Sequence, residues 1–387
     1  MHLPPSRVFF IFLVAFLIGV FAGSFFVLEF GLVLVFLGLI SFLLTFGILA
    51  KEKLTKTTTV ALAIFIFGIL YKHELGDNVL LALDANKFAW LFALKNRFEG
   101  AIKNFLPFPQ SVLLDGILLG SQEQIPWALK QTFVATGLSH ILAVSGYNVT
   151  VVLKVWAEWT RFLGRFTSFI LGLTAVFLFI ILTGANETVV RAGIMGSMFL
   201  LAGFLGRQKT FRNITALTAT IMVLQNPSIL RFNLSFQLSF AALLGLLLIS
   251  PLFQGWFRRT PSFIREAITA TLGALIATFP LLLYHFGQFS LIALLVNVLV
   301  LPLIPLTMAL GFGLGISGLF SEAIGRALSI LVWPLLNYIL SISQFFAQMP
   351  LAQIFPGKIS GLAMAVYYLL LAFLIYSAHR RALASRN

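Results

Sequence analysis

The stretch VFFIFLVAFLIGVFAGSFFVLEFGLVLVFLGLISFLLTFGILA, residues 8–50, contains a single charged residue, Glu29. A bilayer core about 30 Å thick requires roughly 20 residues of α-helix, because each residue advances the helix by about 1.5 Å. Residues 8–28 and 31–50 each reach that length, one on either side of Glu29. The stretch therefore predicts two helices that cross a membrane.

The composition of the whole chain indicates the same class of protein. Of its 387 residues, 60% are hydrophobic and only 10% are charged, whereas soluble domains carry about 25% charged residues. A soluble chain of this composition could not cover its surface with polar groups. The chain has no cysteine, which excludes disulfides, thiolate metal sites and a cysteine nucleophile. We predict an all-α polytopic integral membrane protein.

The apolar runs and the basic clusters between them predict about 11–12 transmembrane helices. Cytoplasmic loops of membrane proteins generally carry an excess of Lys and Arg. We attribute most of the net charge of +14 to this tendency, which places both termini in the cytoplasm. The expected crossings are 9–28, 31–50, 58–71, 138–158, 166–184, 190–206, 213–226, 235–254, 267–286, 289–320, 327–347 and 359–379.

The chain divides into three regions, 1–71, 72–110 and 111–387. The middle region mixes charges of both signs, and Lys95, Glu99 and Lys103 follow one another at i,i+4 spacing. Apolar residues recur on another helical face. They are Leu91, Leu94, Phe98, Ile102 and Phe105. This pattern predicts an extracytoplasmic amphipathic helix in the membrane interface. The next residues, 111–136, are too short and too interrupted to span, and we expect them to pack across the bundle entrance.

One expected crossing, 289–320, is too long for a single straight helix and contains Pro302 and Pro305. Proline removes a backbone hydrogen bond and breaks or kinks a helix. A broken helix at membrane depth persists only where protein or water satisfies its backbone. We predict a broken or re-entrant pair of half-helices, as in many transport sites. A simple kink between packed helices is the alternative.

Polar residues interrupt the apolar run GLSHILAVSGYNVTVV, residues 137–152. His140 and Asn148 are eight residues apart, about two helical turns, so both could face one polar cavity. A helix-end histidine bonded to a neighbouring carbonyl is an equally good interpretation of His140. The pair Ser145–Gly146 suits a polar cavity or a close contact between two helices.

Further polar residues fall within later runs. In LTGANETVVRAGIMG, residues 182–196, Glu187 and Arg191 have the i,i+4 spacing of an ion pair at the membrane edge. A structural pair, pore lining and phosphate contact all remain open for them. Gln237 and Asn297 are isolated polar residues within membrane runs. Such residues form interhelical hydrogen bonds or line a path through the bundle.

Motifs of soluble enzymes are absent from the sequence. There is no P-loop, no HExxH, no GxSxG and no close carboxylate pair. The histidines and acids show no spacing typical of metal ligands. We therefore expect no catalytic residue, no metal and no cofactor. The residues alone predict a polytopic membrane protein with a polar interior.

Four blocks of this sequence, in the same order, resemble the membrane-embedded domain of the ComEC family of competence DNA-uptake proteins. They cover roughly residues 111–310 and read LLGSQEQIP…FVATGLSHILAVSGYNV, LTGANETVVRAGIMG, NPSILRFNLSFQLSFAALLGLLLISP and ATFPLLLYHFGQFSLIALLVNVLVLPLIPL. The resemblance implies passage of single-stranded DNA across the bacterial cytoplasmic membrane during natural transformation. It also implies that six motif positions line or shape the conduit: His140, Ser145, Gly146, Asn148, Arg191 and Gln237.

The resemblance has departures. Asn148 stands where the family motif usually has a second histidine, which argues against proton or metal chemistry at that position. Full-length members commonly carry an OB-like domain and a metallo-β-lactamase-like domain, and neither is expected here. We expect a channel without its own nuclease, and 111–387 as the channel domain. The resemblance implies a cytoplasmic DNA-translocating ATPase, a DNA receptor, a separate nuclease and further copies of the chain as partners. A transporter or membrane enzyme for another anionic or lipid-linked substrate is the alternative.

Overall fold

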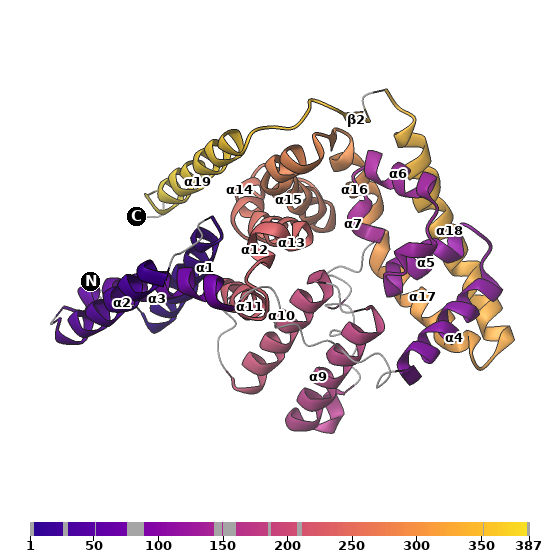
Figure 1. The fold of residues 1–387 in the computed structure, drawn as a ribbon. Helices are drawn as coiled ribbons and strands as arrows, with labels where there is room; N and C mark the ends of the chain where they lie inside the picture. Colours follow the sequence, from indigo (N-terminus) through magenta and orange to yellow (C-terminus); the bar gives the residue numbers. More distant parts are fainter. Residues whose placement is uncertain are drawn as a thin grey trace. The chain divides into compact units, whose positions relative to one another are not determined.

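The computed structural model is almost entirely α-helical over the residues that it describes (Figure 1). These are residues 4–25, 30–50, 52–75, 89–142, 149, 160–184, 187–206, 211–350 and 352–384. Nine helical stretches in this part of the chain are long and apolar enough to cross a membrane. The predicted fold class, an all-α polytopic membrane protein, is therefore confirmed.

The chain separates into two compact units. Unit 1 comprises residues 1–86, 152–180 and 186–237, and unit 2 comprises residues 87–151, 181–185 and 238–387. The elements of unit 1 are α1 (Pro5–Gly23), α2 (Phe30–Leu49), α3 (Lys53–Leu75), η3 (Arg161–Leu163), most of α9 (Arg165–Leu182), α10 (Glu187–Phe204), α11 (Phe211–Gln225), α12 (Ile229–Phe232) and the start of α13 (Leu234–Leu244).

Unit 2 contains the rest of α13 and the remaining elements. They are α4 (Ala89–Phe105), α5 (Gln110–Leu119), η2 (Gln122–Gln124), α6 (Trp127–Ala135), α7 (Ser139–Leu142), the π-helical turn η4 (Gly245–Ile249), α14 (Ser250–Phe253), α15 (Ser262–Phe286), β1 (Phe289–Ser290), α16 (Ala293–Val300), the 3₁₀ turn η5 (Leu301–Leu303), α17 (Ile304–Gly318), α18 (Glu322–Ala347), β2 (Gln353–Ile354) and α19 (Gly361–Ala384). β1 and β2 pair antiparallel, with Phe289 opposite Ile354.

Nine of the twelve expected crossings correspond to these long apolar stretches. The expected crossings 190–206 and 213–226 correspond to the shorter helices α10 and α11. Most of the crossing expected at 138–158 lies outside the described residues.

Unit 1 is held together by close packing of α1 against α3. Gly19 and Gly23 lie one turn apart on α1 and face the backbone of α3 at Phe65 and Ile69, where a Cβ atom would collide. This small-xxx-small spacing lets two helices approach each other closely. At the end of α3, the Tyr71 hydroxyl donates a hydrogen bond to the Leu224 carbonyl of α11 at 2.6 Å. This hydrogen bond joins α3 to α11 in addition to the apolar packing of the unit.

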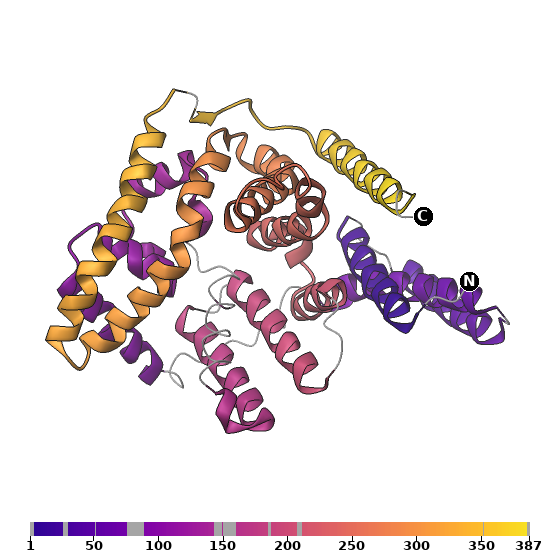
Figure 2. The same cartoon turned by 180° about the vertical axis from the view of Figure 1, so that it is seen from behind.

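The core of unit 2 forms around α5, whose ten residues are all buried. α4, α7, α17 and α18 pack against it, and the two views show α4, α5, α17 and α18 side by side (Figure 2). Glycines of α17 permit this approach: Gly311 faces the side chain of Leu114, and Gly315 faces the ring of Phe98. Of the segment 111–136, which was expected to pack across the bundle entrance, residues 111–119 lie at the centre of this core. A position across the entrance stays a prediction.

The amphipathic helix predicted within 72–110 is α4, Ala89–Phe105. Of its predicted apolar face, Leu91, Phe98 and Ile102 are buried, whereas Leu94 is exposed. The face packs against α17 and α5 of the same unit. A position in the membrane interface stays a prediction.

The interruption predicted at Pro302 is a short one. The α-helix stops at Val300, continues as the 3₁₀ turn Leu301–Leu303, and resumes as α17. The whole stretch Ala293–Gly318 forms one long apolar span. The helix is therefore broken at Pro302 as predicted, by one tighter turn. The geometry over 293–318 corresponds to the kinked alternative and shows no re-entrant hairpin.

Candidate functional site

His140 lies in the four-residue helix α7 of unit 2. Its side chain forms a hydrogen bond with the backbone of Gly137. Gly137 has a positive φ of 72° and packs against Ala293 at the start of α16, where a Cβ atom would collide. This contact brings the beginning of the motif that contains His140 next to α16. The bond to Gly137 corresponds to the local interpretation of His140, and a role in lining a conduit stays a prediction.

Ser145, Gly146 and Asn148, the other predicted residues of this motif, lie outside the described residues. The expectation that Asn148 and His140 face one cavity therefore stays a prediction.

Asn297 belongs to α16 in the same unit, and only 3% of its surface is exposed. Its side-chain oxygen Oδ1 has no hydrogen-bond partner among the described residues. Its backbone carbonyl accepts a hydrogen bond from the N–H of Leu301 at the end of α16. Asn297 thus comes one turn before the 3₁₀ turn that contains Pro302, and Pro305 follows in the first turn of α17. A buried amide oxygen without a partner costs free energy, which marks this position as unusual for a packed helix.

Arg191 lies in α10 of unit 1 and is 9% exposed. Glu187 is the first residue of this helix, one turn earlier, and its side chain lies outside the described part of the structure. The predicted pairing of the two therefore stays a prediction. A guanidinium is expensive to bury in an apolar helix, so Arg191 is the most conspicuous cation of this unit.

Gln237 has a local role. Its Nε2 donates hydrogen bonds to the carbonyls of Leu230 at 3.1 Å and Arg231 at 2.7 Å. These carbonyls belong to α12, and Gln237 lies in the first turn of α13, so the amide joins the two helices. This agrees with the hydrogen-bonding interpretation of Gln237.

The predicted residues thus fall into two groups. Glu187, Arg191 and Gln237 belong to unit 1, and His140 and Asn297 belong to unit 2. No three His, Cys, Asp or Glu side chains in the described part of the chain are grouped so as to hold a metal ion.

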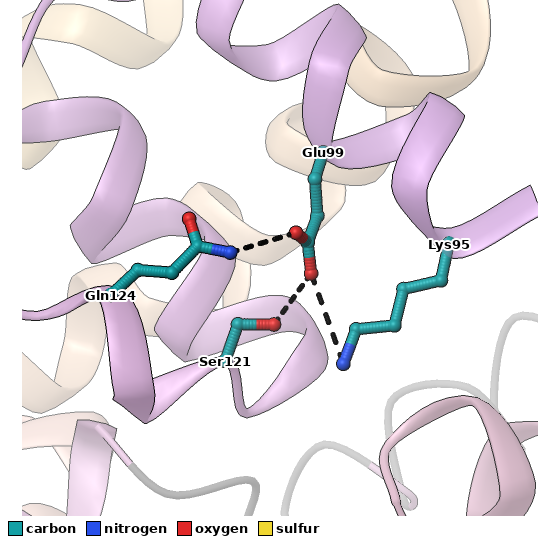
Figure 3. A network of polar contacts seen from close by, with 4 residues as sticks. All are labelled: Lys95, Glu99, Ser121 and Gln124. Carbon is teal, nitrogen blue, oxygen red and sulfur yellow. Dashed lines mark hydrogen bonds and ion pairs between the residues drawn. The ribbon is translucent and has the colours of Figure 1, made fainter. Parts of the chain in front are cut away.

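A polar network in unit 2 was not predicted as a site. Glu99 of α4 is buried, and its carboxylate accepts hydrogen bonds from the Ser121 hydroxyl at 2.6 Å and from Gln124 Nε2 at 3.0 Å (Figure 3). The ammonium group of Lys95 lies 3.8 Å from the same carboxylate. The i,i+4 pairing of Lys95 with Glu99 follows from their spacing. The burial of Glu99 does not, because Ser121 and Gln124 come from beyond α5.

Asp115, at the middle of α5, is the second group that was missed. It is fully buried, and neither of its carboxylate oxygens has a hydrogen-bond partner among the described residues. Burial raises the pKa of Asp115 to about 7, with a further increase from Glu99 and opposing effects from Lys103 and Lys95. The only sequence signal was a lone acid within the apolar run SVLLDGILLG.

The sequence is similar to a known protein family and to two curated proteins. A family model described as "Competence protein" matches residues 117–381. The ComE operon protein 3 of Bacillus subtilis (strain 168) is 30% identical over 216 residues, which cover 55% of this chain and 27% of that protein. An uncharacterized protein of Aquifex aeolicus (strain VF5) is 31% identical over 190 residues, which cover 49% of this chain and 43% of that protein.

The chain thus spans less than half the length of these two relatives. No solved structure matches the chain. The family match extends from α5 to α19 and includes both the Arg191 helix and the Asn297 helix. Because this match covers more than half of the chain, the protein belongs to the ComEC family of competence proteins.

Proposed function

We propose that the chain forms a membrane conduit through which single-stranded DNA crosses the bacterial cytoplasmic membrane during natural transformation. It carries out no catalysis of its own in this role. The proposal rests on membership of the competence family over residues 117–381, a range that includes all ten residues predicted as channel-lining or helix-breaking.

The observation that carries the proposal is Arg191, a buried guanidinium in an apolar helix within the matched region. A polyanion that crosses a bilayer requires a hydrated path with uncharged polar groups and a few cations. Sparse positive charge holds each phosphate weakly and releases it, whereas many fixed cations would trap the strand. Guanidinium groups also bind phosphate oxygens through two parallel hydrogen bonds. Arg191 is the cation that we assign to this contact.

The other residues that we assign to the conduit are His140, Ser145, Gly146, Asn148, Glu187, Gln237 and Asn297, which apart from Gly146 carry polar side chains. Base stacking on aromatic side chains tolerates any sequence, and 14% of the chain is aromatic. The proposed conduit therefore requires no readout of base identity.

The proposed partners follow from the same role. A cytoplasmic DNA-translocating ATPase would pull the strand, a receptor would deliver it, and a separate nuclease would remove the other strand. Further copies of the chain are included among the proposed partners. Both termini are assigned to the cytoplasm by the basic clusters that flank the spans, such as Arg380 and Arg381 after the last one.

The test is uptake of labelled single-stranded DNA into proteoliposomes that contain the chain alone, with double-stranded DNA as the control. Selective entry of the single strand is the expected result. A small organic anion and a lipid-linked anion serve as further substrates. If folded protein admits either of these anions into the proteoliposomes but no DNA, the chain is a transporter of another substrate and the proposal of a DNA conduit is wrong.

A further inference from the structure

Asp115 differs from every other charged group in the core of unit 2. It sits at the middle of α5, its exposed fraction is 0%, and both of its oxygens lack hydrogen-bond partners among the described residues. A buried ionised carboxylate normally receives two or three hydrogen bonds or an ion pair. The surroundings of Asp115 therefore favour the neutral, protonated acid.

The charged groups that act on Asp115 lie on α4. Glu99 accepts hydrogen bonds from Ser121 and Gln124 and pairs with Lys95 (Figure 3), whereas the Asp115 oxygens have no hydrogen-bond partner among the described residues. Lys95 and Lys103 act on Asp115 in the opposite direction to Glu99. The carboxyl is thus influenced by one negative and two positive side chains of a single helix.

The other elements around α5 add few charges. α17 contains no titratable side chain. On α18, Glu322 and Arg326 are exposed and pair with each other at 2.6 Å. α7 contributes His140, and η2 contributes Glu123, which is exposed. The charge state of Asp115 is therefore decided mainly by burial and by α4.

We propose that Asp115 is a proton-binding site that the chain uses during transport. Binding adds one proton from water to a carboxylate oxygen and forms one O–H bond, and release returns that proton to water. No other bond changes. A metal ion is a poor occupant, because two lysines lie in the surroundings and no cluster of three ligating side chains exists among the described residues.

Release of the proton has a structural consequence. It leaves an uncompensated negative charge in the packed core between α4, α17 and α18, which is unfavourable if nothing moves. Water entry, or a shift of α4 that brings Lys95 or Lys103 closer, would relieve that cost. Proton binding is thereby coupled to the packing of α4 against α5. In the proposed conduit, this coupling makes transport sensitive to pH.

The first experiment measures the proton directly and does not depend on transport. Infrared difference spectra of the full chain in proteoliposomes are recorded from about pH 5 to about pH 9 and examined for the C=O stretch of a protonated carboxyl. With a pKa near 7, about 90% of Asp115 is protonated at pH 6 and about 10% at pH 8. We expect a band that falls in this way, is absent from Asp115→Asn and persists at a shifted frequency in Asp115→Glu. Glu123→Gln, at an exposed acid close in sequence, is the control and should retain the band.

The second experiment uses the uptake assay and rests on the proposed function. Between pH 6 and pH 8, wild-type uptake should change about tenfold, as the protonated fraction does, and Asp115→Asn should be nearly independent of pH. Equal pH profiles in the two proteins would overturn a role in transport. A carboxyl band that does not titrate, or that survives in folded Asp115→Asn, would overturn the proton site itself. Absence of DNA entry in the wild type would count against the conduit alone, because the infrared result stands without it.

Discussion

The hydroxyl of Ser121 donates a 2.6 Å hydrogen bond to the buried carboxylate of Glu99, across a chain separation of 22 residues. The bond ties the segment that follows α5 back to α4. Since α5 lies between the two residues in sequence, the contact closes a loop around the central helix of unit 2. A buried carboxylate depends on such partners, because each removed donor leaves part of its charge unsatisfied.

Ser121→Ala should therefore destabilise the protein although it removes a single oxygen atom. A hydrogen bond to a charged group contributes about 1.5–3 kcal/mol, and we expect a loss in this range. Thermal unfolding in detergent, followed by circular dichroism, measures it. Ser329→Ala is the matched control, because the Ser329 hydroxyl bonds only a carbonyl of its own helix at an exposed position. Equal melting temperatures for the two variants would show that the Ser121–Glu99 bond contributes nothing.

The α1–α3 contact predicts a steric effect in unit 1. A Cβ atom at Gly19 would collide with the backbone of Phe65, which cannot move as a flexible side-chain end could. Overpacking of this kind typically costs about 1–3 kcal/mol, so Gly19→Ala should lower the melting temperature. At Gly38 of α2, an added Cβ meets no atom within 4 Å, and Gly38→Ala should leave stability unchanged or slightly raise it through better helix propensity. A similar response at both glycines would contradict the close packing.

Asp115 predicts how stability depends on pH. Its pKa is raised from 3.8 to about 7 in the folded protein. Between these two pH values, Asp115 is therefore protonated in the folded state and ionised in the unfolded state. Stability is then fully present below about pH 4, falls as the pH rises toward 7 and levels off above it. Asp115→Asn should remove this part of the slope, and Glu266→Gln, at an exposed acid of α15, should not. Denaturation in detergent at several pH values gives the slopes, and a wild-type slope unchanged in Asp115→Asn would refute the assignment.

The sequence predicted the membrane spans well, because length and apolar composition are local properties. Residues 8–50 form α1 and α2. A 3₁₀ turn interrupts the α-helix at Pro302, where the proline predicted an interruption. The role of α5 could not be predicted in this way. Its burial depends on Gly311 of α17, which lies almost two hundred positions away and lets α17 approach Leu114.

The same limit applies to the candidate site. The spacing of Lys95 and Glu99 predicted their contact but placed it on a polar surface, whereas Ser121 and Gln124 cover it in the fold. The hydrogen bonds of Gln237 to α12 were among the alternatives for that residue, since they are made only seven and six positions away. Asp115 was overlooked because one acid in an apolar run has no pattern until its neighbours from other helices are known.

The conduit itself predicts that Arg191→Ala impairs DNA uptake in protein that is still folded. Removal of the guanidinium takes away a phosphate contact, and Arg191→Lys should restore part of the activity because it keeps the charge and loses only the planar fork of donors. Uptake into proteoliposomes, compared at equal amounts of monodisperse protein, measures the effect. Arg258→Ala removes an exposed arginine between α14 and α15 and should leave uptake unchanged.

Asn148→Leu tests a second residue of the proposed conduit. It replaces a neutral polar group of the motif at 137–152 by an apolar one of similar size, so folding should tolerate it better than a charge. If Asn148 lines a hydrated path, the leucine removes a hydrogen-bonding group and adds an apolar wall, and uptake should fall as it does in Arg191→Ala. The neighbouring conservative change Val149→Ile, at a buried apolar position, controls for disturbed packing. Normal uptake in both Arg191→Ala and Asn148→Leu would remove these residues from the conduit, whereas a loss in Asn148→Leu that Val149→Ile shares would assign position 148 to packing.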